Sequence, residues 1–288
     1  MFLIHNLPTL KEPMILFEHI PKTAGSTLNW ILSQNYTNRF FINQNLNPLD
    51  SLAGLAESPI NPDQVELIHG HAAYLFDKYP NTKRITMLRE PVSQMLSQFA
   101  FIREQSNHVS HQDVKNMTQI RDYIEYAKEK KHTNLQTRIL AQSNSWITNE
   151  PDSFDLEPKG QEAMLSKALE RMASFDFVLL TEEFDASVLL LAHQLSWRKT
   201  PYYYRLNPTK KSIKKSTLSE DELELIKETQ AIDIKLHQAA VQRFNNDKLN
   251  YLNQFDIDQF KLRNDQKQAF GFLGMRLKYK LKHLLLGK

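Results

Sequence analysis

Short apolar runs alternate with longer amphipathic stretches along the 288 residues of this chain. Brief apolar runs bounded by proline, glycine or polar residues are typical of buried strands, and four stand out: 14–20, 65–68, 84–88 and 175–180. Helical spacing predicts helices over 25–34, 91–105, 120–130, 135–141, 161–173, 185–195 and 219–244. Loops are predicted over 37–64, with at most one short helix, 106–118 and 202–216. This alternation predicts an α/β fold, with a parallel sheet flanked by helices and additional helices at the C-terminus.

Composition narrows the chemistry that the chain can perform. It contains no cysteine, which excludes disulfides, thiolate catalysis and cysteine-based zinc sites. No run approaches the roughly 18 apolar residues of a membrane-spanning helix. Residues 1–17 have neither the basic start nor the long apolar core of a secretory signal. We therefore expect a protein of the reducing cytoplasm.

Charge is distributed unevenly along the chain. Residues 261–288 hold eight of the 36 lysines and arginines and one of the 33 acidic residues, so residues 1–260 carry a formal charge of −4. We expect 1–260 to form a single domain that does not bind nucleic acid. In 261–288, apolar residues recur at helical spacing between basic ones. Such a helix either lies on an anionic membrane surface or packs on the domain, and the sequence leaves both alternatives open.

A strand, a short turn and a helix follow one another around Lys22 and Gly25. The first N–H groups of a helix have no intrahelical partner, and the helix dipole favours negative charge there. Gly25 allows close approach of a ligand, Lys22 adds positive charge, and Ser26 and Thr27 add hydroxyl groups. The turn predicts a site for a phosphate or a sulfate ester, and the alternative is a helix N-terminus capped by serine or threonine. It is not a Walker loop, in which the lysine follows the last glycine.

A second candidate site begins at Arg89, where a predicted strand ends. An arginine at the carboxyl end of a parallel strand lies where α/β folds bind ligands, and its planar guanidinium suits a phosphate. Ser93 and Ser97 are four residues apart, on one face of the helix that follows. The alternative is a salt bridge from Arg89 to Glu90 or Glu104, with the serines facing solvent.

His69 and His71 flank Gly70 at the end of the second predicted strand. Residues two apart on a strand point to the same side, so both imidazoles are expected to face one site. Three interpretations compete. A metal site would need a third ligand, and none is close in sequence. The histidines are otherwise structural, or they include a general base, since a reference pKa of about 6.5 suits removal of a proton from a sugar hydroxyl.

Together these segments resemble the carbohydrate sulfotransferases that use 3′-phosphoadenosine-5′-phosphosulfate (PAPS). Residues 18–27, EHIPKTAGST, resemble the 5′-phosphosulfate loop of that family, and 88–97, LREPVSQMLS, are similar to its 3′-phosphate-binding segment. The sequence HGH at 69–71 is similar to a motif of the heparan sulfate 2-O-sulfotransferases. The most similar branch contains the heparan sulfate 2-O- and 6-O-sulfotransferases and their bacterial relatives. The resemblance implies the P-loop-NTPase-like fold of the sulfotransferases.

The resemblance also implies roles for individual residues. His71 would be the general base and His69 its assistant, while Arg89 and Ser97 would hold the 3′-phosphate. Lys22 would touch the bridging oxygen and stabilise the leaving phosphate. The residues that would bind the 5′-phosphosulfate are Lys22, Thr23, Ala24, Gly25, Ser26 and Thr27.

Two weaker assignments rest on the same resemblance. Arg138 lies in the sequence NLQTR, which is similar to a recurring family segment, and would reach substrate or nucleotide; the alternative is an exposed helix arginine. Thr209, Lys210 and Lys211 lie in a basic loop placed to close over the nucleotide, or in an ordinary solvated loop.

The implied reaction transfers a sulfuryl group from PAPS to a hydroxyl of a carbohydrate or glycolipid acceptor, releasing 3′-phosphoadenosine-5′-phosphate (PAP), with no metal. Two rivals stay open. A non-catalytic protein that binds a phosphonucleotide or an anionic glycan would have no use for His69 and His71, and a nucleotide kinase would need magnesium and a Walker lysine. Unlike the animal enzymes, the chain shows no membrane anchor and no cysteine, so it resembles the bacterial relatives. We expect polysaccharide precursors as acceptors and a cytoplasmic location, at the inner face of the membrane if 261–288 bind it.

Overall fold

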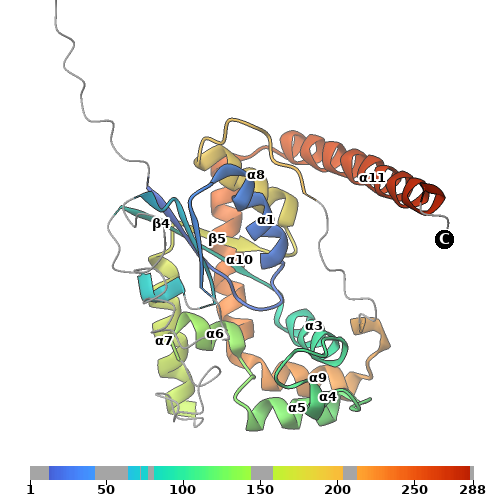
Figure 1. The fold of residues 1–288 in the computed structure, drawn as a ribbon. Helices are drawn as coiled ribbons and strands as arrows, with labels where there is room; N and C mark the ends of the chain where they lie inside the picture. The colour runs from blue at the N-terminus through green and yellow to red at the C-terminus, as the bar shows by residue number, and fades with distance from the viewer. Residues whose placement is uncertain are drawn as a thin grey trace, which may run out of the picture.

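The computed structural model describes residues 13–42, 64–71, 73–76, 81–143, 158–203 and 213–285. Its centre is a sheet of five parallel strands in the order β2-β3-β1-β4-β5 (Figure 1). The strands are β1 (Met14–Glu18), β2 (Arg39–Ile42), β3 (Leu67–Gly70), β4 (Thr82–Leu88) and β5 (Phe177–Leu180). The parallel sheet with its flanking helices confirms the predicted α/β fold.

The strand register brings three chain segments together at one edge of the sheet. Glu18, the last residue of β1, pairs with Gly70 at the end of β3 and with Thr86 of β4, which continues to Leu88. β1 is buried along its whole length because it is the middle strand of the sheet. The residues that follow β1, β3 and β4 therefore lie close together, at the edge where α/β folds bind ligands.

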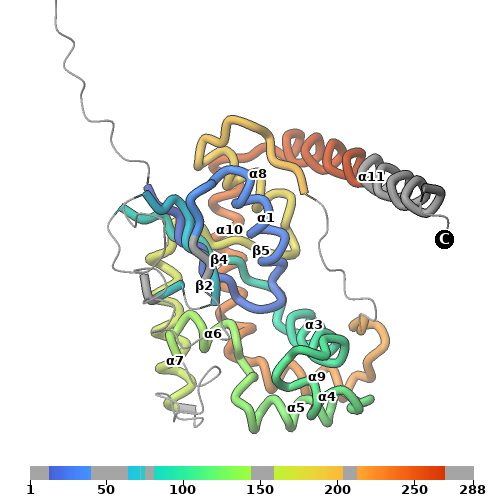
Figure 2. The backbone as a smooth tube through the Cα atoms, in the orientation of Figure 1, coloured from blue at the N-terminus to red at the C-terminus, as the bar shows by residue number. Residues whose placement is uncertain are grey.

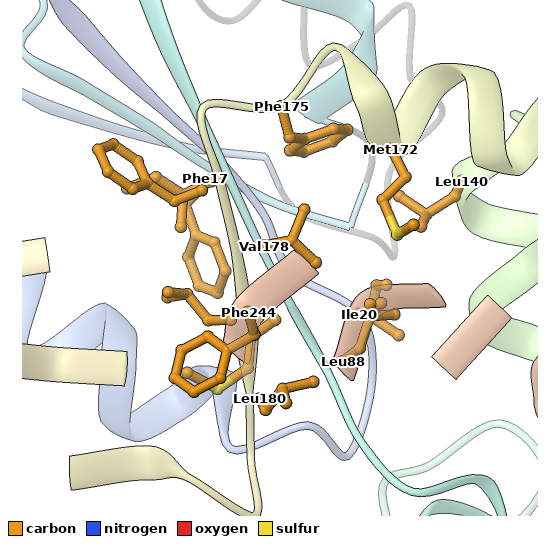
Figure 3. Close-up of a cluster of buried hydrophobic side chains, with 14 of the residues drawn as sticks. Phe17, Ile20, Leu88, Leu140, Met172, Phe175, Val178, Leu180 and Phe244 are labelled. Carbon is orange, nitrogen blue, oxygen red and sulfur yellow. The ribbon is translucent and has the colours of Figure 1, made fainter. Parts of the chain in front are cut away.

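Helices cover both faces of the sheet. α1 (Gly25–Asn35) and α8 (Phe184–Gln194) share one side, and α7 (Pro158–Ala173) lies on the other (Figure 1). α10 (Ala231–Tyr251) packs against β5, α7 and the short helix α6 (Leu135–Leu140). The core between these layers includes Phe17, Val178 and Phe244 (Figure 3). Burial of each such side chain contributes roughly 1.5–3 kcal/mol to folding, which holds the sheet edge in place.

A second group of helices lies beside the sheet. It consists of α3 (Pro91–Glu104), α4 (His111–Val114), α5 (Ile120–Glu129) and α9 (Glu220–Thr229) (Figure 1). This group has its own apolar cluster, in which Phe99, Tyr123 and Ile226 are buried and the first two rings stack 4.7 Å apart. The segment between β1 and α1 dips toward α3 (Figure 2). It therefore lies between the sheet and the second helical group.

Three features depart from the predicted elements. Within the loop predicted over 37–64, Arg39–Ile42 form β2, a strand too short to show a period, while 43–63 lie outside the described residues. The loop predicted over 106–118 contains α4. The single helix predicted over 219–244 is two helices, α9 and α10, which meet at Gln230.

The C-terminal helix α11 (Gln254–Leu285) crosses the predicted boundary at residue 260. Ile257, Phe260 and Asn264 on its first turns are buried, whereas most described side chains from 265 to 269 are exposed. The division into 1–260 and 261–288 stays a prediction. Among the described helices, none combines the length and the apolar composition that crossing a membrane requires.

Candidate active site

The segment between β1 and α1 forms a tight turn around Lys22. Lys22 and Ala24 both have left-handed backbone conformations, with φ values of 64° and 61°, which cost roughly 1–2 kcal/mol each. Ala24 is the N-cap of α1 and gives the helix no side-chain hydrogen bond, while its carbonyl accepts from the N–H groups of Thr27 and Leu28. The alternative of a serine or threonine cap is therefore wrong, and the N-terminal dipole of α1 faces the turn without a side-chain partner.

Side chains that follow β4 hold this turn in place. Arg89 Nη1 donates a hydrogen bond of 3.0 Å to the carbonyl of Lys22. Gln94 Nε2, on the first turns of α3, donates to the carbonyl of Pro21 at 3.1 Å. The left-handed turn and the start of α3 are thus one connected unit, which brings the two predicted anion-binding segments together.

The hydroxyl groups of the turn differ in their surroundings. Thr23 is fully buried, and its Oγ1 donates to the carbonyl of Ile20 at 2.8 Å, so it stabilises the turn itself. Ser26 is exposed at the first turn of α1, and Thr27 is buried. Of the three, Ser26 is the hydroxyl best exposed to a ligand at the start of α1.

Lys22 extends its ammonium group toward α3. Its Nζ lies 3.7 Å from the centroid of the Phe101 ring, a cation–π contact. Burial and the nearby Arg89 lower the pKa of Lys22 to about 8, against the opposing charge of Glu104. Ser97, partly exposed, precedes Phe101 by one turn on the same face of α3. Two partly buried cations so close together repel each other, and an anion between them would relieve that repulsion.

Arg89 directly follows β4, and its guanidinium points toward the Lys22 turn. Glu90, one predicted salt-bridge partner, is used elsewhere. Its carboxylate accepts from the N–H groups of Val92 and Ser93 as the cap of α3, and it pairs with Lys215 in the 3₁₀ turn Lys215–Thr217. Burial lowers the pKa of Arg89 despite the nearby carboxylates, but a guanidinium stays charged.

Three imidazoles lie near one another where β1 and β3 end: His19 and His71 are in direct contact, and His69 is near enough to lower the pKa of His19. The rings of His19 and His71 stack with centroids 4.5 Å apart, and His71 Nδ1 hydrogen-bonds to the carbonyl of His19. Because a carbonyl can only accept, Nδ1 carries the proton and Nε2 holds the lone pair. Burial lowers the pKa of His71 to about 4, and burial together with Arg39 lowers that of His69 to about 4. His71 is therefore neutral at pH 7, with its lone pair on Nε2. Its pKa lies below the value of about 6.5 from which the sequence predicted a general base, because the ring is buried.

His19 has a second contact besides the stacked ring of His71. Its ring also occupies the space beside Gly25, where an added Cβ atom would lie 1.9 Å from His19 Cδ2. Burial, and then the neighbouring His71 and His69, hold the pKa of His19 well below its usual value. The glycine is thus required by the imidazole, a reason different from the predicted approach of a ligand.

Replacing Gly25 by alanine is expected to destabilise the fold by about 1–3 kcal/mol, because the new methyl group and the His19 ring cannot both fit. Urea denaturation of four proteins tests this: wild type, Gly25→Ala, His19→Ala and the double variant. We expect Gly25→Ala to cost much less stability in the His19→Ala background. An equal cost in both backgrounds would contradict the assigned contact.

His108 is a site neighbour that sequence reasoning left unassigned. Its ring meets the edge of Phe101, the ring that Lys22 covers, at a centroid distance of 5.8 Å. The N–H of Ser110 donates to His108 Nδ1 at 3.1 Å, so Nε2 carries the proton of the neutral ring. Burial, and then the positive charge of Lys22, lower the pKa of His108. The sequence indicates its place only by a histidine in the segment that follows α3.

Glu18 was also missed as part of this edge. Its carboxylate is fully buried and accepts hydrogen bonds from both terminal nitrogens of Arg171 on α7, with Nη1 at 2.8 Å from Oε1. The pair ties the last residue of β1, directly before His19, to the helix layer. Removing one partner of such a buried pair lowers the free energy of unfolding by about 3–5 kcal/mol, because it leaves the other charge uncompensated.

The weaker assignments have mixed outcomes. Arg138 is 1% exposed and its Nε donates to the carbonyl of Thr133 at 2.9 Å, so the alternative of an exposed arginine is wrong. A contact of Arg138 with nucleotide or substrate stays a prediction. The basic loop residues Thr209, Lys210 and Lys211 lie outside the described residues. Within the described parts of the chain, no three histidine, aspartate or glutamate side chains are grouped so that they could hold a metal ion.

Comparison with known proteins places this geometry in context. Residues 76–256, more than half of the chain, match the family model described as galactose-3-O-sulfotransferase. The matched range includes Arg89 and Ser97 and begins after Lys22 and His71. A crystal structure of a sulfotransferase from Alicyclobacillus acidocaldarius is similar over 81% of this chain and 97% of that chain, with 16% sequence identity and a TM-score of 0.44. Among curated proteins, no sequence matches the chain.

Proposed function

Because the chain belongs to the galactose-3-O-sulfotransferase family, we propose that it transfers a sulfuryl group from PAPS to a hydroxyl of a carbohydrate. Membership of the sulfotransferases, expected from the sequence, is confirmed by the family match. PAPS as the donor, a galactose-containing sugar as the acceptor and a histidine base are the proposed refinements.

One observation carries the proposal: two cations and a helix N-terminus without a side-chain cap meet at one sheet edge. The Arg89 guanidinium hydrogen-bonds to the turn that holds Lys22, and that turn leads into α1. A PAPS molecule is anionic at both its 3′-phosphate and its 5′-phosphosulfate. The arrangement suits such a ligand, with Arg89 and Ser97 near the 3′-phosphate and the Lys22 turn near the 5′ group.

When bound, PAPS supplies the sulfuryl group and PAP is the product that remains. Lys22 and the first N–H groups of α1 stabilise the negative charge that develops on the 5′-phosphate. The ammonium of Lys22, which lies over the Phe101 ring of α3, is the proposed donor to that phosphate. Most of the rate enhancement then comes from positioning and electrostatics, without a metal.

His71 acts as the general base in this proposal. Its Nδ1–H is fixed by the carbonyl of His19, so Nε2 has the lone pair that accepts the proton of the acceptor hydroxyl. The same hydrogen bond stabilises the imidazolium that results. Stacking on His19 keeps the ring orientation fixed. His69, two residues before His71, is the proposed assistant.

Binding of PAP without magnesium tests the donor. We expect calorimetry to show binding to wild type, and Arg89→Ala to weaken it by roughly 10- to 100-fold, because charged hydrogen bonds contribute about 1.5–3 kcal/mol. ATP with magnesium is the control for the nucleotide kinase alternative. Preference for ATP and dependence on magnesium, or no binding of PAP, would contradict the proposal.

Membrane contact and cellular location are separate proposals. Residues 261–285 lie on α11, and the segment 261–288 is rich in lysine and arginine, so its attraction to anionic lipid would place the protein at the inner face of the membrane, near glycolipid acceptors. Sedimentation with phosphatidylcholine vesicles, with and without phosphatidylglycerol, distinguishes this from packing of the helix on the domain.

A further inference from the structure

The backbone of Arg89 is held by a side chain that lies 47 residues further along the chain. Gln136 Oε1 accepts a hydrogen bond from the N–H of Arg89 at 2.9 Å, and Gln136 Nε2 donates to the carbonyl of Arg89 at 2.8 Å. An amide side chain that makes both bonds imitates a neighbouring strand. It therefore extends the pairing of β4 by one residue beyond its end at Leu88.

Gln136 is itself firmly anchored. Its side chain is 1% exposed, and its backbone N–H donates to Asp233 Oδ2 on α10 at 3.1 Å. Asp233 Oδ1 also accepts from the backbone N–H and the Oγ1 of Thr137, at 2.7 and 2.6 Å. Asp233 thus caps α6 from another helix, and the position of Gln136 is fixed before it reaches Arg89.

The capping is reciprocal. Asn134, with a φ of 49°, precedes α6, and its Oδ1 accepts from the N–H groups of Ile232 and Asp233 at the start of α10. Its own N–H donates to Gln230 Oε1 at 2.9 Å. Each helix satisfies the N-terminus of the other, so the junction behaves as a rigid support.

We infer that Gln136 is a positioning residue, which sets the Arg89 guanidinium for the 3′-phosphate of the nucleotide through paired hydrogen bonds to the Arg89 backbone. The inference rests on the proposed function. The paired bonds limit rotation of the Arg89 backbone, so the guanidinium stays directed at the Lys22 turn, to which it donates. In this proposal the neutral Gln136 side chain acts through the Arg89 backbone and not by contact with the nucleotide.

The test compares Gln136→Leu with Gln230→Leu, a matched control. Gln230 is also 1% exposed and lies at the same helix junction, where it bonds to Asn134 and not to Arg89. We expect Gln136→Leu to weaken PAP binding by about tenfold. Affinity for adenosine 5′-monophosphate, which lacks the 3′-phosphate, is expected to change by no more than about twofold, because Gln94 still holds the Lys22 turn through the carbonyl of Pro21. Gln230→Leu is expected to lose thermal stability to a similar degree and to keep PAP binding within about twofold.

A second comparison separates positioning from general damage. In the Arg89→Ala background, the Gln136→Leu change is expected to have no further effect on PAP binding, because the group it positions is gone. The inference would be overturned if Gln136→Leu bound PAP as tightly as wild type, or if the variant lost affinity for PAP and for adenosine 5′-monophosphate equally. In either case, PAP binding by wild type would leave the proposed function intact. If wild type binds no PAP, both fall.

Discussion

Replacing His71 by asparagine is expected to lower kcat by about a thousandfold and to leave the affinity for PAP unchanged. The asparagine Nδ2 can replace the Nδ1–H donor to the carbonyl of His19, so the local hydrogen bond is kept. What is lost is the Nε2 lone pair that takes the acceptor proton. Steady-state kinetics with a sulfated-product readout, beside calorimetry with PAP, measure both quantities.

His69→Asn is the matched control for this experiment. His69 lies in the same cluster, in β3 itself, and its assistant role predicts a smaller loss of kcat than that of His71. Equal losses in the two variants would mean that the cluster is structural. A His71→Asn protein with unchanged kcat would remove the histidine base from the mechanism.

Replacing Lys22 by methionine is expected to lower kcat by about a hundredfold or more and to weaken PAP binding, since a preorganised donor to the developing charge is removed. Methionine keeps the unbranched shape of the side chain over Phe101, which limits structural damage. Kinetics and calorimetry on Lys22→Met are compared with those on Phe101→Leu, which keeps the ammonium but loses the aromatic ring beneath it. The comparison separates the effect of the charge from the effect of the ring that positions it.

The pKa of Lys22 gives this prediction a pH signature. Because burial and Arg89 lower that pKa to about 8, the ammonium loses its proton as the pH rises through 8. We expect wild-type affinity for PAP to fall by about tenfold between pH 7 and pH 9. Lys22→Arg stays charged across this range and should bind PAP with a flat profile. A wild-type profile as flat as that of Lys22→Arg would contradict the assignment of Lys22 to the anion site.

The sequence predicted the local elements of the site well. The run 14–20 and the helix after it correspond to β1 and α1, and Pro91 begins α3 as its position indicated. Each of these elements is encoded by adjacent residues, through apolar period and capping chemistry. Parallel strands then place Lys22 and Arg89 at one edge, which requires only the general rule for α/β sheets.

Contacts between distant segments could not be predicted in this way. The break between α9 and α10 at Gln230 contains neither proline nor glycine. Instead, Asn134, which precedes α6 about a hundred residues earlier, accepts hydrogen bonds from the first N–H groups of α10. Arginine is usually a surface residue, yet Arg138 is buried and its Nε donates to the carbonyl of Thr133, just before α6. The identity of Gly25 is explained by a ring six residues earlier, and periodicity carries no information about that contact.

The reciprocal caps between α6 and α10 also set an order of assembly. The support of Arg89 runs from Gln136 to Asp233, so the sheet edge near residue 89 is completed by residues made more than a hundred positions later. During synthesis, the N-terminal strands emerge from the ribosome with their anion-binding edge still unbraced. Such long-range closure slows folding, and it also means that a nascent chain cannot present the finished site before α10 has docked.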